Sequence, residues 1–145
     1  MARGYPDYFG QSIWPKYGTP IYTLDSDHVL PSGEVGTLLS ISMPGVLFSL
    51  DIGVQALEVM TLSLLTLTID GQSFAVVGLG NPAYGLPAAA QSPLLYTVIY
   101  DHLEYYQRIV LAREVPFHST VVLQCSNGTA SDMSVTTEAV HYVVT

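Results

Sequence analysis

The stretch VMTLSLLTLTIDGQSFAVVG, residues Val59 to Gly78, decides the fold. Hydrophobic and hydroxyl side chains alternate along its first half, and a period of two residues is typical of a β-strand with one buried face. Asp70-Gly71 follows, a residue pair that favours a tight type I′ turn. The segment therefore predicts a β-hairpin that turns at Asp70-Gly71 and returns through residues 73–77.

The alternation changes phase inside this stretch. The apolar residues are even-numbered from Met60 to Leu64 and odd-numbered from Leu65 to Ile69. A β-bulge, or a strand that passes from one packing face to another, produces such a change. On this pattern we place Leu62, Leu64 and Leu67 in the hydrophobic core.

Most of the remaining chain also has the pattern of strands. Even-numbered apolar residues from Val46 to Val54 alternate with Leu47, Ser49, Asp51 and Gly53. Residues 94–101, 119–125 and 134–145 are rich in strand-forming side chains. The expected core residues are Val46, Phe48, Leu50, Leu62, Leu64, Leu67, Val121 and Leu123. About eight or nine strands and no strong helix indicate an all-β sandwich or barrel.

Residues 103–114 are ambiguous. Glu104 and Arg108 have the i,i+4 spacing of a helical ion pair, but the β-branched and aromatic content of the segment favours a strand, which we choose. Two further segments are predicted to connect strands. Ser126–Ser134 is a polar turn, and Gly80–Pro93 is a long Pro/Gly/Ala-rich loop, a type of loop that is often used for contacts.

The composition of the chain limits the kinds of partner that it can bind. Charged residues make up only 11% of the 145 residues, and the mean hydropathy is +0.37, so a free monomer would expose much apolar surface. We therefore expect a homo-oligomer, a trimer or ring. The net charge of −8 and the four basic side chains argue against nucleic-acid binding and against docking on anionic membranes.

The sequence contains no catalytic pattern. The histidines His28, His102, His118 and His141 are spread over the chain, and neither G-x-S-x-G nor G-x-G-x-x-G is present. Cys125 stands alone, which favours a buried thiol in a strand over a nucleophile. We interpret Asn127-Gly128-Thr129 as residues that stabilise a turn. We expect no enzyme activity, no cofactor and no metal site.

The opening of the chain, residues 1–20, predicts an extended arm outside the sandwich of residues 21–145. Its prolines and glycines prevent a continuous strand or helix. Large aromatics in such a segment must be buried against something, and we assign them as interface anchors on a neighbouring subunit. The rival interpretation is an arm folded over its own domain as a lid. No export signal is visible. The anchors are Tyr5, Tyr8, Phe9, Trp14 and Tyr17.

Two segments resemble a known class of protein. Residues 96–144 resemble the C-terminal half of bacteriophage virion β-sandwich domains in the turn Pro116-Phe117-His118-Ser119-Thr120, the loop Ser126–Ser134 and the Val/Tyr-rich final strand (Val140, Tyr142, Val143, Val144). Residues 3–18 resemble the start of small phage and prophage structural proteins. The resemblance implies a jelly-roll-like antiparallel β-sandwich without catalytic residues. It also implies a virion component, such as a capsid decoration, head-fibre base, collar or tail accessory protein, made in the host cytoplasm and bound to other virion proteins.

A second hypothesis from a different class is a carbohydrate- or receptor-binding β-sandwich module. Its sugar-stacking platform would be tyrosines, which are also common in strands and in subunit interfaces. A monomer that binds glycans would favour this hypothesis, whereas an oligomer without glycan affinity favours the virion component. The tyrosines concerned are Tyr96, Tyr100, Tyr105, Tyr106 and Tyr142.

Overall fold

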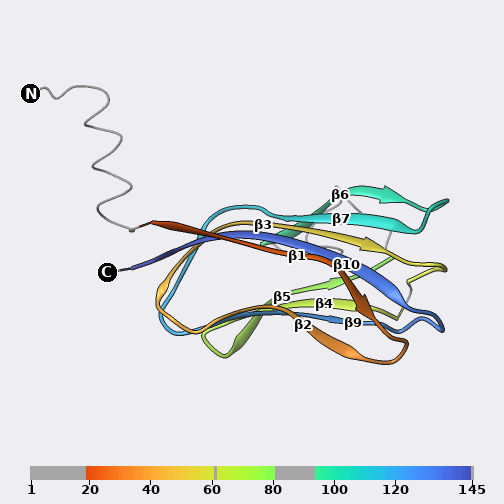
Figure 1. Ribbon diagram of the computed structural model, residues 1–145, viewed down its shortest axis with the longest axis horizontal. Helices are drawn as coiled ribbons and strands as arrows, with labels where there is room; N and C mark the ends of the chain where they lie inside the picture. Colours follow the sequence, from red (N-terminus) through yellow and green to blue (C-terminus); the bar gives the residue numbers. More distant parts are fainter. Residues whose placement is uncertain (1–18, 61, 81–93, 145) are drawn as a thin grey trace, which may run out of the picture.

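The computed structural model describes residues 19–60, 62–80 and 94–144, which form ten β-strands in two antiparallel sheets packed as layers (Figure 1). Sheet A has the order β1-β10-β3-β7-β6, with β8 pairing β3, and sheet B has the order β2-β9-β4-β5. The all-β sandwich prediction is therefore confirmed. The strands are β1 (Pro20–Leu30), β2 (Val35–Ile41), β3 (Gly45–Gln55), β4 (Leu64–Ile69), β5 (Gln72–Gly78), β6 (Leu95–Asp101), β7 (Tyr106–Leu111), β8 (Val115–Phe117), β9 (Val121–Ser126) and β10 (Met133–Val143).

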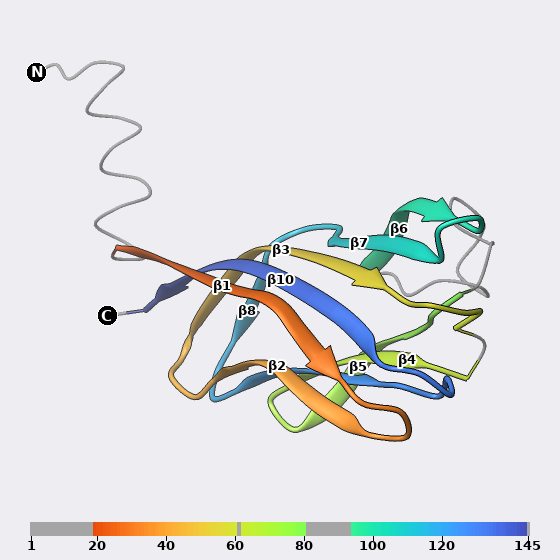
Figure 2. The same ribbon diagram turned by 45° about the vertical axis from the view of Figure 1, so that its right-hand side comes forward.

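The strand pairing is that of a jelly roll. β1 pairs with β10, β2 with β9, β3 with β8 and β4 with β5, as if one long hairpin had been rolled up into two sheets. Figure 2 shows β1, β10 and β3 together in one layer and β2, β4 and β5 in the other. Because Pro20 pairs with Tyr142, β1 begins at the end of the sandwich where β10 finishes.

The predicted hairpin is present. Ile69 pairs with Gln72, and Asp70 and Gly71 have φ values of 52° and 83°, the positive values that a type I′ turn requires. The phase change has a different cause from the one we expected. Strand β4 starts only at Leu64, and a turn in which Ser63 N donates to the Met60 carbonyl precedes it. Leu62 is therefore 77% exposed and Leu64 46% exposed, so their assignment to the core was wrong.

The assignment of Phe48 to the core was also wrong. In the ladder between β3 and β10, Ser49 pairs with Val140 and Leu47 with His141, which leaves Phe48 as the extra residue of a bulge. The bulge turns Leu47 into the core, where it is fully buried, and leaves Phe48 50% exposed with its ring edge-to-face against Tyr142. The other expected core residues are buried: Val46, Leu50, Leu67, Val121 and Leu123.

Residues 103–114 form a turn, strand β7 and the start of the next connection, so the helical alternative is wrong. The Asp101 carboxylate accepts hydrogen bonds from the backbone N–H groups of Leu103 and Glu104 and so closes the turn before β7. Arg108 forms its ion pair with Asp51 of the adjacent strand β3 instead of with Glu104.

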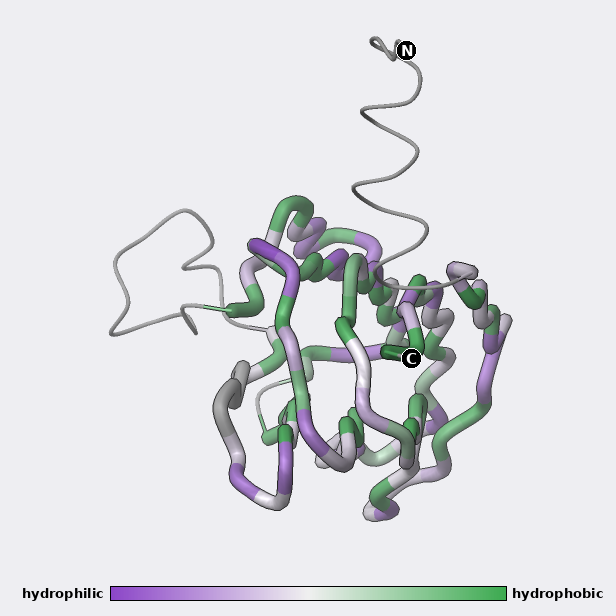
Figure 3. The backbone as a smooth tube through the Cα atoms, turned by 90° about the vertical axis from the view of Figure 1, so that its left-hand side faces the viewer, coloured by the Kyte–Doolittle hydropathy of each residue, from purple (hydrophilic) through white to green (hydrophobic). Residues whose placement is uncertain are grey.

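The core lies between the two sheets, and hydrophobic and hydrophilic residues alternate along much of the backbone (Figure 3). The loop between β9 and β10 is held by Asn127, whose buried side-chain amide donates to the carbonyls of Leu30 and Ser131 while Thr129 N donates to its Oδ1. These hydrogen bonds confirm the prediction that Asn127-Gly128-Thr129 stabilises a turn. No helix in the described ranges is long and apolar enough to cross a membrane.

Candidate functional site

The groups that could do chemistry are dispersed. In residues 19–60, 62–80 and 94–144, no three His, Cys, Asp or Glu side chains come together as a metal site would require. His28 contacts Asp25 at 2.9 Å on the edge strand β1. His141 is buried on β10, and its Nδ1 has no hydrogen-bond partner within the part of the chain that the structure describes. Burial lowers the pKa of its imidazole.

Asp70 has a structural role. Its carboxylate accepts hydrogen bonds from the backbone N–H groups of His118, Ser119 and Thr120, at distances from 2.7 to 3.1 Å, and from the Ser119 hydroxyl at 3.0 Å. These donors stabilise the charged form and hold the pKa of Asp70 well below its ordinary value. The carboxylate thus ties the β4–β5 hairpin to the connection between β8 and β9.

Cys125 is fully buried in β9, and burial raises the pKa of its thiol to about 12. A nucleophilic cysteine needs a lowered pKa and access to solvent. The prediction of a buried thiol is confirmed.

The five tyrosines of the sugar-platform hypothesis do not form one surface. Tyr142 is buried and contacts Phe48, Tyr105 packs partly buried against the core, and the Tyr100 hydroxyl donates to the Gly80 carbonyl. Tyr96 and Tyr106 are the remaining two. They lie at opposite ends of the β6–β7 ladder, since Tyr96 pairs with Val110 and Tyr106 with Asp101.

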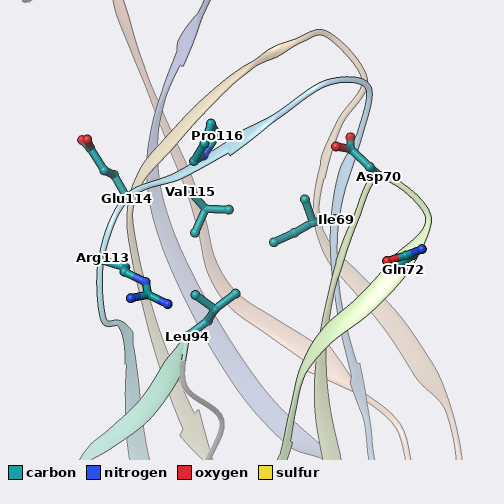
Figure 4. Close-up of a pocket in the computed structure, with 8 residues that line it drawn as sticks. All are labelled: Ile69, Asp70, Gln72, Leu94, Arg113, Glu114, Val115 and Pro116. Carbon is teal, nitrogen blue, oxygen red and sulfur yellow. The ribbon is translucent and has the colours of Figure 1, made fainter.

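An open pocket of about 500 Å³ lies between the β4–β5 hairpin and the segment joining β7 to β8 (Figure 4). Ile69, Leu94 and Val115 point toward its centre, and the charged residues Asp70, Arg113 and Glu114 stand around the rim. Such an apolar pocket with a few polar groups can take a single large side chain or a small ligand.

The outward-facing side of sheet A carries a charged cluster at its centre. Arg108 of β7 binds Asp51 of β3 with two hydrogen bonds of 2.5 and 2.9 Å. This ion pair raises the pKa of Arg108. Glu138 of β10 pairs directly with Asp51 across the ladder, and its carboxylate accepts a hydrogen bond of 3.1 Å from the Tyr22 hydroxyl. We call the exposed side of β1, β10, β3 and β7 around these four residues the outer face.

Two hollows of about 280 Å³ each flank this cluster. One is lined by Tyr22, Val110 and Val140 together with the two carboxylates, Asp51 and Glu138. The other is lined by Gly53, Ile99, Tyr106 and Thr136 and by the same two carboxylates with Arg108. The Tyr106 ring lies over Gly53, since a Cβ at Gly53 would meet the Tyr106 hydroxyl at 2.9 Å. The outer face therefore offers two partly apolar hollows on either side of a charged centre.

One end of the sandwich is also apolar. Leu57 and Leu103, from the β3–β4 and β6–β7 connections, are 74% and 76% exposed, and Leu62 is 77% exposed. The two connections are joined where Ala56 N donates to the Tyr105 carbonyl. We call this region, with the half-exposed Val59, the apolar end.

The interface anchors expected from the sequence, Tyr5, Tyr8, Phe9, Trp14 and Tyr17, lie outside the described residues. Sequence reasoning did not find the outer face. Its members come from strands far apart in the chain, and the only signal was the alternation that turns Asp51, Arg108 and Glu138 away from the core.

Comparisons with known proteins found similarity in structure and none in sequence. No protein-family model matches the chain, and no curated protein matches its sequence. The fold is similar to a protein in the acidic stable capsid structure of Helicobacter pylori bacteriophage KHP30, with 6% identity, 86% of this chain and 94% of that chain covered, and a TM-score of 0.45. It is also similar to the VP2 protein of an infectious bursal disease virus subviral particle, with 12% identity, 86% of this chain and 33% of that chain covered, and a TM-score of 0.44. Both neighbours are proteins of viral particles.

Proposed function

We propose that this chain is a structural subunit of a bacteriophage particle that self-associates through its jelly-roll domain and docks its N-terminal arm on a neighbouring subunit. Jelly rolls serve viral capsids, lectins and other proteins, so the function must rest on the surface of this one. The virion setting rests on the sequence resemblance of residues 96–144 and 3–18 to phage structural proteins. In such a particle the chain would be a capsid decoration, collar or tail accessory protein.

The observation that carries self-association is the apolar end. Three leucines that are about three-quarters exposed, Leu57, Leu62 and Leu103, belong to connections at one end of the sandwich. Several large apolar side chains exposed at one end of a soluble protein are a typical feature of a contact with another protein. The charged fraction of the whole chain is only 11%, which also favours burial of apolar surface in an assembly.

The test is the mass of the full chain and of Leu103→Asp by sedimentation velocity at micromolar concentration. Leu103 is exposed, so an aspartate should leave the fold intact but oppose burial of this end in a contact. Gln124→Asp, on the exposed side of β9, is the matched control. We expect oligomers for the wild type and the control and a smaller species for Leu103→Asp. A monomeric wild type would contradict the proposed function.

A further inference from the structure

The outer face has an uncompensated carboxylate. Asp51 and Glu138 lie opposite each other in the ladder, and Arg108 is committed to Asp51 by two hydrogen bonds. Among the described residues, the only hydrogen bond that Glu138 accepts from a side chain is the one from the neutral Tyr22 hydroxyl. Two negative charges therefore share one positive charge, and the exposed Glu138 is the group that a further cation would meet.

The arm carries the complementary charge. Two of the four basic side chains, Arg3 and Lys16, lie before residue 19, with one of the twelve acidic residues, Asp7. The rest of the chain therefore has eleven acidic and two basic side chains. Lys16 is the only lysine in the sequence, and it stands in the segment Trp14-Pro15-Lys16-Tyr17, between two large aromatics.

We propose that the outer face is the docking site for residues 14–17 of a neighbouring copy of this chain, an inference that rests on the proposed self-association. The Lys16 ammonium binds the Glu138 carboxylate between the two hollows. Trp14 and Tyr17 fill the hollows, one on the Tyr22 and Val140 side and the other over Gly53 and Tyr106. The arrangement matches the composition of protein interfaces, in which aromatic anchors fill pockets around a paired charge.

The start of β1 favours a neighbour's arm over the chain's own. Pro20 pairs with Tyr142 near the end of the ladder and disfavours a helical conformation at Thr19. Glu138 lies four residues back along β10, about 13 Å away at the usual rise per residue. To reach it, the chain's own Lys16 would have to reverse direction within residues 17–19. The arm of a second copy is not tied to Pro20 of this sheet and needs no such reversal.

The first test uses the single lysine. Unlabelled full-length protein is mixed with protein labelled with heavy nitrogen, treated with a carbodiimide that joins amines to carboxylates, digested and analysed by mass spectrometry. We expect a cross-link between Lys16 and Glu138. Cross-links that join a labelled copy to an unlabelled copy should occur at the frequency given by random exchange of copies. Links from Lys16 to Asp70 or Glu114 would place the arm in the pocket of Figure 4 instead and overturn the proposal. Links confined to one label would assign the site to the chain's own arm and overturn it too.

The second test is a charge exchange measured by sedimentation in the full chain. Glu138→Lys and Lys16→Glu each place like charges together, so each should weaken association about tenfold or more, and the double variant should recover most of the loss. Asp132→Lys, an exposed carboxylate in the β9–β10 loop, is the control and should have little effect. A double variant no better than the single variants would overturn the proposal, as would single variants that associate like the wild type. A monomeric wild type would instead overturn the proposed function, so the two failures are distinguishable.

Discussion

Leu64 and Leu65 are adjacent in the chain, and the structure gives them opposite environments. Leu65 faces the core from β4 and is fully buried, whereas Leu64 faces outward and is 46% exposed. The same substitution, leucine to alanine, at both positions removes the same atoms. Because the two variants have the same composition, effects on the unfolded chain largely cancel in the comparison.

The expected magnitudes differ about threefold. Truncating a fully buried leucine loses its transfer free energy and leaves a cavity, which together cost about 3 kcal/mol or more. Leu64 keeps about half of its surface in water already and leaves no enclosed cavity, so its truncation should cost about 1 kcal/mol. For a domain of this size 1 kcal/mol shifts the melting temperature by about 4 °C, so we expect decreases of ~12 °C for Leu65→Ala and ~4 °C for Leu64→Ala.

The assay is thermal unfolding followed by circular dichroism, with all proteins at one concentration because association makes the melting temperature concentration-dependent. Leu67→Ala, at a second fully buried position of β4, should behave like Leu65→Ala. If Leu64→Ala lowered the melting temperature as much as Leu65→Ala, the register of β4 described here would be wrong.

Three further predictions concern titratable groups. Because the pKa of Asp70 is lowered in the folded chain, its stabilising effect is present above its ordinary value of 3.8 and is lost as pH falls below it. Asp70→Asn should therefore melt below the wild type at neutral pH, and the difference in melting temperature should shrink in acid; a constant difference would contradict the carboxylate's role. The pKa of buried His141 is lowered from 6.5, so the unfolded chain binds the proton more readily and the free energy of unfolding should fall as pH drops below about 6.5. His141→Gln should flatten that part of the stability profile, and an unchanged profile would count against a buried neutral imidazole. Cys125 should resist alkylation at about pH 8 in the folded protein and react once urea unfolds it, because its thiol is buried and its pKa is raised to about 12; rapid labelling of the native chain would refute this.

Local sequence signals predicted much of the fold. Asp70-Gly71 marked the hairpin, and the alternation of Val121, Leu123 and Cys125 gave the buried side of β9. These signals work because turn type and side-chain alternation depend on neighbouring residues alone.

The failures come from contacts between distant segments. Phe48 turned outward because β10 pairs with Ser49 and Leu47 and skips it, which no pattern within β3 could reveal. Leu62 alternates like a strand residue but lies within the turn that the hydrogen bond from Ser63 N to the Met60 carbonyl closes. The outer face depends on the register that sets Glu138 of β10 opposite Asp51 of β3, and alternation alone cannot supply a register between strands so far apart in sequence.

The proposed function requires that this jelly-roll domain assembles as a repeated subunit. The most direct measurement is the native mass of the full-length protein over a concentration series through the micromolar range, by sedimentation equilibrium. We expect a discrete species at a whole-number multiple of 15.7 kDa, whose fraction increases with protein concentration. A single species of 15.7 kDa throughout the series would contradict it.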